Sequence, residues 1–380
     1  MIDSVAAYER PSLYVHVPFC VSKCRYCDFN SHEGAGRDLD GYVDALVEEA
    51  RRRAPRRPPT VFIGGGTPTF LPETALARLM SGLADAGAFD DPGVEVTVEA
   101  NPESASLEKL RRLRAGGATR LSIGVQSFRE RYLHLFDRVH GVDDARRAIE
   151  HAREAGFRRV NLDLIAAKPG ESAGEWSEDL ERALALAPEH LSCYELTFEE
   201  GTALRRDLAR GRVEPVDEDA RAALDHATAA RLARDGFLRY EVSAFARDGE
   251  ECRHNLVYWT SGEWIGIGAG AGTSIGARKH LNVRSPEAYA AAIRTRGDAT
   301  DPATVESSDA DTRLAEVLLM GLRLADGLPL DVIRRRSGTD LLARHAGVVR
   351  ALEADGLVRC AGGRIRCTDR GRDLGDHVVQ

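Results

Sequence analysis

Residues 12–27 read Ser-Leu-Tyr-Val-His-Val-Pro-Phe-Cys-Val-Ser-Lys-Cys-Arg-Tyr-Cys. The apolar run at 12–17 predicts a short β-strand, and the cysteines that follow it, Cys20, Cys24 and Cys27, fall within eight residues. Three thiols on one loop after a strand predict a ligand set for a metal group rather than a disulfide framework. Reactive groups at the carboxyl end of a strand are typical of folds with a parallel sheet.

A pattern of strand followed by helix repeats along the first half of the chain. Short runs rich in Val, Ile and Leu predict strands at 12–17, 60–63, 94–98, 120–123, 159–164 and 190–195. Amphipathic stretches between them predict helices at 38–53, 73–87, 106–115, 143–155 and 174–186. Because parallel strands need such crossovers, the alternation predicts a parallel sheet, either doubly wound or curled into a barrel.

The residues at the strand ends favour the barrel. Polar or glycine residues stand at or after the carboxyl end of the later strands, namely Gly64–Pro68, Glu99, Gln126, Asp163 and Glu195. A barrel active site requires such residues at that end of every strand. We therefore predict an α/β fold, a partial (β/α)6 TIM-like barrel over residues 1–215. Six units leave the barrel incompletely closed, with a wide mouth that suits a large cofactor.

The remaining chain predicts two further units. Residues 216–305, with a helix at 217–235 and a glycine-rich stretch at 262–276, are expected to complete the barrel. Residues 306–380 predict three helices and a hairpin at 357–360 and 364–367, which is a winged-helix-like α+β appendage. Its candidate recognition helix at 341–355 carries only scattered basic residues, so DNA binding is not expected.

Composition excludes several classes of function. The 380 residues include 60 acidic and 52 basic ones, and this net charge of −8 argues against a general nucleic-acid binder. No 18 apolar residues run together and no signal peptide is evident, so a cytoplasmic protein is expected. The dense basic run at 51–57 predicts a solvated helix end that complements the helix dipole, with at most peripheral membrane contact.

The spacing of the three cysteines favours an iron–sulfur cluster over zinc. Structural zinc sites use four ligands, usually in two separated pairs, whereas thiolates hold an iron–sulfur cluster one per iron. Three cysteines on a 4Fe–4S cluster leave one iron open to a further ligand. Zinc remains the alternative at this point.

The Cys-x3-Cys-x2-Cys loop resembles that of the radical S-adenosylmethionine superfamily. The resemblance implies a 4Fe–4S cluster whose open iron chelates S-adenosylmethionine, which the cluster cleaves to a 5′-deoxyadenosyl radical. Residues 13–20, 64–68, 99–102 and 122–128 are similar to the oxygen-independent coproporphyrinogen III oxidase branch of that superfamily.

This resemblance also implies roles for individual residues. Tyr14 is expected over the cluster and Tyr26 near the adenine. Gly65, Gly66 and Thr67 are expected at the methionine end, where the absence of side chains admits a carboxylate to backbone amides. Glu99 is expected to hold the amino group or ribose, and a second S-adenosylmethionine site is implied for Gln126, Arg138 and Asp163. Structural alternatives stay open, because a glycine run can be a plain turn and the charged residues can be caps or ion pairs.

Two features point within this branch to its heme chaperones. The oxidases carry a further cysteine two positions after the third cluster ligand and a longer N-terminal segment, whereas this chain has Phe29 there and 19 residues before Cys20. The stretch His254-Asn255-Leu-Val-Tyr258-Trp259 matches the H-N-x-x-Y-W motif associated with heme in the chaperones. A neutral imidazole can ligate heme iron, and Tyr and Trp can pack on a porphyrin. The structural alternative is a hydrogen-bonded core histidine.

The resemblance therefore implies heme as cargo and hemoproteins as recipients, with membrane-bound respiratory enzymes as candidates. The alternative function is the oxidation of coproporphyrinogen III to protoporphyrinogen IX, and a radical enzyme that modifies heme is a third. Two departures bear on these expectations. Ala166-Ala167-Lys168 replaces a glycine-containing turn near the second cofactor site, and Gly272 stands where relatives often have histidine.

Overall fold

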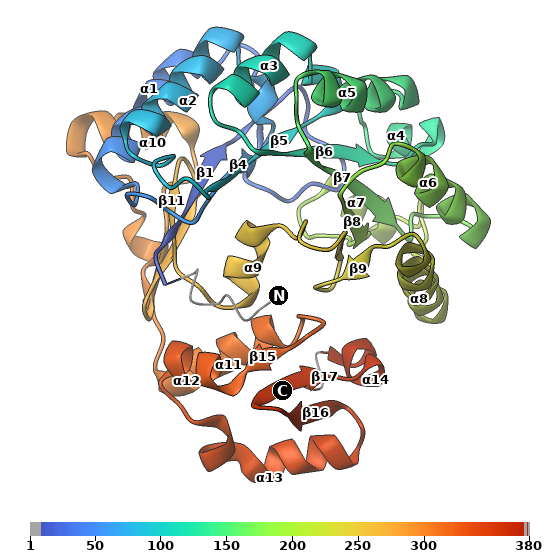
Figure 1. The fold of residues 1–380 in the computed structure, drawn as a ribbon. Helices are drawn as coiled ribbons and strands as arrows, with labels where there is room; N and C mark the ends of the chain where they lie inside the picture. Colours follow the sequence, from blue (N-terminus) through green and yellow to red (C-terminus); the bar gives the residue numbers. More distant parts are fainter. Residues whose placement is uncertain (1–8, 376–377, 379–380) are drawn as a thin grey trace.

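The parallel strands follow one another around an open barrel, as Figure 1 shows. The computed structural model describes residues 9–375 and residue 378. Six strands are hydrogen-bonded in chain order, β1 (Ser12–Val17), β4 (Thr60–Gly65), β5 (Glu95–Ala100), β6 (Arg120–Gln126), β7 (Arg159–Ala166) and β8 (His190–Glu195), and every neighbouring pair is parallel. The prediction of a partial (β/α)6 barrel is confirmed.

Helices cover the outside of this sheet (Figure 1). The predicted ones are α1 (Leu39–Arg53), α2 (Glu73–Asp85), α3 (Leu107–Ala115), α5 (Val142–Glu154) and α6 (Ala173–Ala185), each within two residues of its expected bounds. Within residues 1–215, two short helices were not predicted, α4 (Glu130–Leu135) and α7 (Ala203–Ala209). Both are under two turns long, so they carry too few residues for a helical period to show.

Later residues extend the sheet at both edges. Beyond β1 lie β11 (Trp264–Ile267), which is parallel to β1, and then the antiparallel strands β12 (Gly272–Ile275), β13 (Arg278–Leu281) and β14 (Glu306–Ser307). Beyond β8 lie β10 (Ala244–Ala246) and β9 (Leu238–Arg239), both antiparallel to their neighbours. Helices α8 (Glu218–Arg234), α9 (Arg253–Trp259) and α10 (Pro286–Arg296) belong to this region.

The two faces of the strands differ in chemistry. Side chains on the outer face of the central strands are fully buried and apolar, as in Leu13, Val61, Val96 and Leu121. Alternate residues point inward, and many of these are polar, including Glu99, Ser122 and Asp163. The apolar face packs under the helices, whereas the polar face lines the interior of the barrel.

The C-terminal residues form a unit of helices and a small sheet, and its core also includes Tyr240, Ala244, Ala246, Leu256 and Val257. Helices α11 (Ala310–Gly321), α12 (Leu330–Ser337), α13 (Leu341–Ala354) and α14 (Asp369–Asp373) pack with a three-stranded antiparallel sheet in the order β15 (Leu328–Pro329), β17 (Arg364–Cys367), β16 (Val358–Ala361). The predicted hairpin is β16 and β17. Among the described residues, no helix is both long and apolar enough to cross a membrane.

Candidate cofactor site

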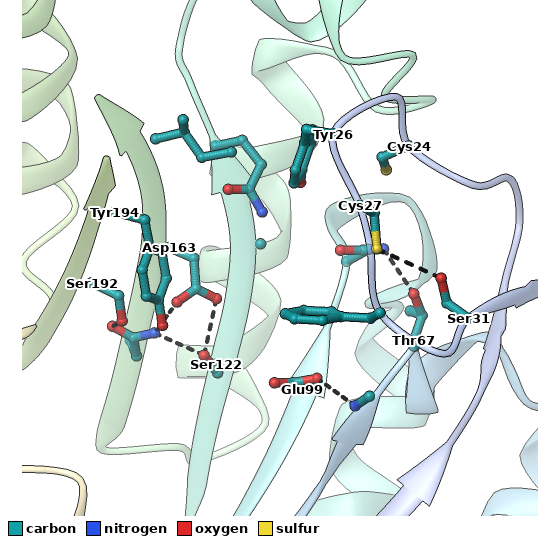
Figure 2. A pocket seen from close by; sticks show the side chains of 18 of the residues that line it. Cys24, Tyr26, Cys27, Ser31, Thr67, Glu99, Ser122, Asp163, Ser192 and Tyr194 are labelled. Carbon is teal, nitrogen blue, oxygen red and sulfur yellow. Dashed lines mark hydrogen bonds between the residues drawn. The ribbon is translucent and has the colours of Figure 1, made fainter. Parts of the chain in front are cut away.

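A cavity of about 630 Å³ occupies the interior of the barrel. Its lining runs from the cysteine loop to residues at the amino ends of the strands, and on β6 it extends from Arg120 to Gln126. At 3.3 Å per residue this strand alone gives the cavity a length of roughly 20 Å. Figure 2 shows Cys24 and Cys27 on one side of it, with Asp163, Ser192 and Tyr194 facing them across the interior.

The three predicted cluster ligands line one end of this cavity. Cys20 lies on the short strand β2 (Phe19–Cys20), which pairs with β3 (His32–Glu33), and Cys24 and Cys27 lie on the loop between them. Each sulfur has a polar neighbour: Thr67 Oγ1 donates to Cys20 Sγ at 3.4 Å, Arg138 Nη1 donates to Cys24 Sγ at 3.5 Å, and Cys27 Sγ lies 3.6 Å from Ser31 Oγ. Burial raises the pKa of Cys20 to about 11.

These thiols fit a cluster better than a single ion. Within the described part of the chain, no three His, Cys, Asp or Glu side chains gather closely enough to hold one metal ion. A four-iron cluster takes one thiolate per iron, so its ligands do not need to meet at one point. Hydrogen bonds from a hydroxyl and a guanidinium to two of the sulfurs are the interactions that stabilise thiolate ligands and tune a cluster.

The backbone amides of the glycine loop after β4 are already hydrogen-bonded within the protein, whereas the sequence predicted that they bind a carboxylate. The amides of Gly65, Gly66 and Thr67 already donate to Glu99 Oε2 (2.9 Å), Val17 O (2.9 Å) and Phe19 O (2.8 Å). A Cβ on Gly66 would lie 2.7 Å from Val17 O. Gly66 therefore lacks a side chain because it packs against the backbone that carries Cys20, whereas a Cβ on Gly65 would meet the His16 ring. The expected approach of a carboxylate to free amides is not what this arrangement offers.

Glu99 and Asp163 place two buried carboxyl groups in the cavity (Figure 2). Burial raises the pKa of Glu99 to about 8, against the lowering effect of the Gly65 amide. Burial also raises the pKa of Asp163, although Ser122 and Asn161 donate to its oxygens at 3.1 and 2.8 Å. Glu99 can therefore carry a proton near neutral pH and donate it to a ligand, and the pKa of Asp163 is shifted in the same direction.

Arg138 ties several parts of the site together. Its Nη2 donates to Asn101 Oδ1 at 2.7 Å and to the carbonyl of Gly124 at 2.8 Å, and its Nη1 contacts Cys24. Burial opposes its charge, but Tyr26, Cys24 and Glu103 raise the pKa of Arg138 overall. The guanidinium is therefore a fixed cation between the cysteine loop and the end of β6.

Gln126 stands in a strained position at the end of β6. Its φ of 67° lies in the left-handed region, and the pairing of β6 with β7 is shifted between Gly124 and Gln126. Bulges and positive φ values at non-glycine residues concentrate at functional sites, where they aim a side chain. This bulge turns Gln126 into the cavity lining.

Two tyrosines with expected cofactor roles differ in placement. Tyr26 lines the cavity and packs edge-on against Phe136, with the ring centroids 4.9 Å apart. The hydroxyl of Tyr14 lies 2.8 Å from His16 Nδ1, and Tyr14 is not part of the described cavity lining. The cavity thus brings together the three cysteines and every predicted S-adenosylmethionine residue except Tyr14.

The heme-associated motif forms helix α9 and is mostly buried. His254 is fully buried, with Nδ1 2.7 Å from Thr60 Oγ1 and Nε2 2.9 Å from the Tyr258 hydroxyl. Burial lowers the pKa of His254 to about 3, so the ring is neutral. Neither nitrogen is free to ligate iron in this arrangement, in contrast to the expected axial ligand. Asn255 lines the cavity, whereas Trp259 packs against the C-terminal core.

The two sequence departures lie outside the cavity lining. Ala167 adopts a φ of 57°, the left-handed conformation that a glycine would take there more readily. Lys168 is buried and paired with Glu171 at 2.5 Å and Asp179 at 3.3 Å, away from the cavity. Gly272 lies on β12, where its carbonyl accepts from Trp264 Nε1 at 2.8 Å.

Several lining residues were not predicted as site residues. They share inward-facing positions on the parallel strands, and include Phe62, Thr97, Arg120, Ser122, Asn161, His190, Ser192 and Tyr194. The signal was present as polar residues at every second position, for example Arg120, Ser122 and Gln126 on β6. Such an alternation marks the interior face of a strand, but strands with this pattern more often face solvent.

Comparisons with known proteins agree with this architecture. The Radical SAM superfamily model matches residues 14–183, and the HemN C-terminal domain model matches residues 309–374. The solved structure of coproporphyrinogen III oxidase (HemN) from Escherichia coli is similar over 100% of this chain and 91% of that chain, with a TM-score of 0.82 and 26% identity.

Curated relatives give the family. The heme chaperone HemW of Mycobacterium tuberculosis is 40% identical over 375 residues, which is 97% of this chain and 93% of the relative. HemW of Bacillus subtilis is 33% identical over 376 residues, 97% of each. A bovine mitochondrial protein, radical S-adenosyl methionine domain-containing protein 1, is 36% identical over 332 residues, covering 84% and 74%. Matches of this identity over nearly the whole length show that the chain belongs to the HemW family of the radical S-adenosylmethionine superfamily.

Proposed function

We propose that this protein binds heme in the barrel cavity and delivers it to recipient hemoproteins. The observation that carries the proposal is the cavity itself, about 630 Å³ with an aromatic and polar lining, in a chain whose relatives are named heme chaperones. Cavities of several hundred Å³ with a few convergent polar groups are typical of cofactor sites. Membrane-bound respiratory enzymes are the recipients we propose to examine first.

The radical S-adenosylmethionine family implies a 4Fe–4S cluster and S-adenosylmethionine. We assign the cluster ligands to Cys20, Cys24 and Cys27, with Arg138 and Thr67 hydrogen-bonded to two of the sulfurs. When bound, these groups supply one-electron chemistry at an open iron. The chain itself orients ligands through Glu99, Gln126 and Asp163, and its buried walls exclude water from them.

The H-N-x-x-Y-W motif contributes to the floor of the cavity in this proposal. Asn255 faces the cavity, and the hydrogen bond between His254 and Thr60 holds α9 against β4, while Tyr258 bonds to the other nitrogen of His254 within the helix. His254 also stacks near Phe62, a lining residue, with centroids 5.2 Å apart. Contact between heme and the motif residues His254, Asn255, Tyr258 and Trp259 remains a prediction.

Coproporphyrinogen III oxidation is the second candidate. The likeness to the Escherichia coli oxidase over the whole chain favours it. Phe29 disfavours it, because this side chain is 64% exposed at the cavity lining where the resemblance places the additional cysteine of the oxidases. Oxidative decarboxylation of two propionates requires accurate positioning of each, and a displacement of about 1 Å can cost about 100-fold in rate.

A cavity-filling substitution tests the location of heme. Ser122 points into the cavity beside Asp163, so Ser122→Phe removes space that heme would need. We expect Ser122→Phe to weaken heme binding at least tenfold in a spectroscopic titration. The matched control adds the same ring at an exposed position of α13, Val348→Phe, and should bind heme as the wild type does. Folded Ser122→Phe protein with unchanged affinity would remove heme from the cavity, and a wild type that binds no heme would refute the function.

A further inference from the structure

Two buried polar groups without partners lie side by side at the amino end of the cavity. Thr97 on β5 and Arg120 on β6 are paired in register, so their side chains lie on the same inner face. Each is only 1% exposed, and both line the cavity. Within the described residues, Thr97 Oγ1 and Arg120 Nη2 make no hydrogen bond.

Among the described residues, no carboxylate lies within ion-pair distance of Arg120, although its charge acts on Asp163 against the rise in pKa that burial causes. Its Nη1 donates to the carbonyl oxygen of Glu250 at 3.0 Å, and no ion pair that the structure describes includes it. The carboxylates of Glu95 and Glu250 are engaged by Arg159 instead, at 2.9 and 2.6 Å. A guanidinium buried without a counter-ion is costly, so this position favours the binding of an anion.

The neighbouring polar groups do not supply that anion. His190 lies between Asn161 Oδ1 at 2.6 Å and the Tyr240 hydroxyl at 2.9 Å, and burial lowers its pKa well below the usual value, so it is neutral. Asp163 accepts hydrogen bonds from Ser122 and Asn161. Thr97 Oγ1 and Arg120 Nη2 therefore remain unpartnered donors in residues that line the cavity.

We propose that Arg120 and Thr97 bind a carboxylate group of the cavity ligand, and that in the heme-loaded protein this group is a heme propionate. The assignment rests on the proposed function. A guanidinium offers planar paired donors that match a carboxylate, and the adjacent hydroxyl adds a third donor. The other carboxylate in the system belongs to S-adenosylmethionine, whose expected place is at the cysteine end, roughly 20 Å away along β6.

The test varies the ligand and the protein together. Heme and heme dimethyl ester, which has no free carboxylate, are titrated into cluster-loaded wild type, Arg120→Met, Arg120→Lys and Thr97→Val, with S-adenosylmethionine affinity measured in parallel. We expect the wild type to prefer heme to its ester at least tenfold. Arg120→Met should abolish that preference by weakening heme and not the ester, and Arg120→Lys should keep part of it.

The Thr97→Val variant distinguishes the loss of a ligand contact from misfolding as the cause of a reduced preference for heme. Because Thr97 Oγ1 has no partner, a methyl group of the same shape should not lower the thermal midpoint, yet it should reduce the preference for heme over its ester. Equal wild-type affinity for heme and ester, or a preference that survives in Arg120→Met, overturns this assignment alone. Parallel loss of S-adenosylmethionine affinity in Arg120→Met overturns it as well, whereas a wild type that binds neither porphyrin overturns the proposed function.

Discussion

At the residue scale, the cysteine loop is supported from two sides. Thr67 from the glycine loop and Arg138 from the segment after α4 each donate to a different cysteine sulfur. The sequence predicted both residues as cofactor contacts through resemblance, but it gave no sign that they reach the sulfurs. Thr67 and Cys20 are 47 positions apart in the sequence, and Arg138 and Cys24 are 114 positions apart. Contacts over such separations depend on the fold and not on the local sequence pattern.

The first prediction concerns these thiolates. Cys24→Ala removes one of three cluster ligands and the acceptor of Arg138, so iron and sulfide should fall to near zero after anaerobic reconstitution. Cys193→Ala, a cysteine that does not line the cavity, should retain wild-type iron content. A Cys24→Ala protein that still holds four irons would contradict the ligand assignment.

The second prediction concerns Gly66. A Cβ there would lie 2.7 and 2.8 Å from backbone atoms of Val17 and Phe19, so Gly66→Ala should displace the strand that carries Cys20. We expect a loss of about 2 kcal/mol in unfolding free energy together with reduced cluster content. Gly347→Ala, on the exposed side of α13 with open space around it, should instead gain about 0.5–1 kcal/mol. Unchanged cluster content in Gly66→Ala would contradict this packing role and would favour the prediction that the glycine leaves room for a ligand.

At the element scale, the strands were predictable and the cavity floor was not. Runs of apolar residues predicted the six parallel strands, because outward-facing side chains such as Val96 and Leu121 are buried under helices. Helix α9 was missed because its seven residues show no helical period and are held by tertiary contacts. His254 bonds to Thr60 on β4, while Leu256 and Val257 join the C-terminal core. The H-N-x-x-Y-W motif, predicted to ligate heme, therefore also makes tertiary contacts that connect the barrel to the C-terminal unit.

The third prediction uses the buried imidazole of α9. His254 stays neutral in the folded protein because burial lowers its pKa to about 3, whereas in the unfolded chain it takes up a proton below about pH 6.5. A lowered histidine pKa makes stability fall as the pH drops below 6.5, by about 1.4 kcal/mol per pH unit. Between pH 6.5 and 5 the wild type should lose about 2 kcal/mol more unfolding free energy than His254→Gln.

Urea unfolding at both pH values measures this difference. His134→Gln, at an exposed position on α4, serves as the control and should follow the wild type. Parallel pH profiles for wild type and His254→Gln would show that the imidazole is not held neutral, and would reopen its role as a ligand.

At the scale of the whole molecule, we propose that one barrel holds two kinds of ligand. The cysteine end of the cavity has the residues that the superfamily resemblance assigns to the cluster and S-adenosylmethionine, and the amino end has Arg120, Thr97 and Asn255. The C-terminal unit contacts the barrel after α9, where Arg313 donates to Ser261 O at 3.4 Å, and at β13, where Lys279 pairs with Glu316 at 2.7 Å. The depth of the cavity could not be predicted, because it depends on how far the strands curl.

We propose that this barrel carries heme and does not oxidise a porphyrinogen. One measurement tests it most directly: anaerobically reconstituted protein with S-adenosylmethionine and a low-potential reductant is given heme and coproporphyrinogen III in parallel. We predict a heme-bound absorption spectrum in the first sample and no protoporphyrinogen in the second. Formation of protoporphyrinogen IX, or the absence of any heme-bound species, would contradict the proposed function.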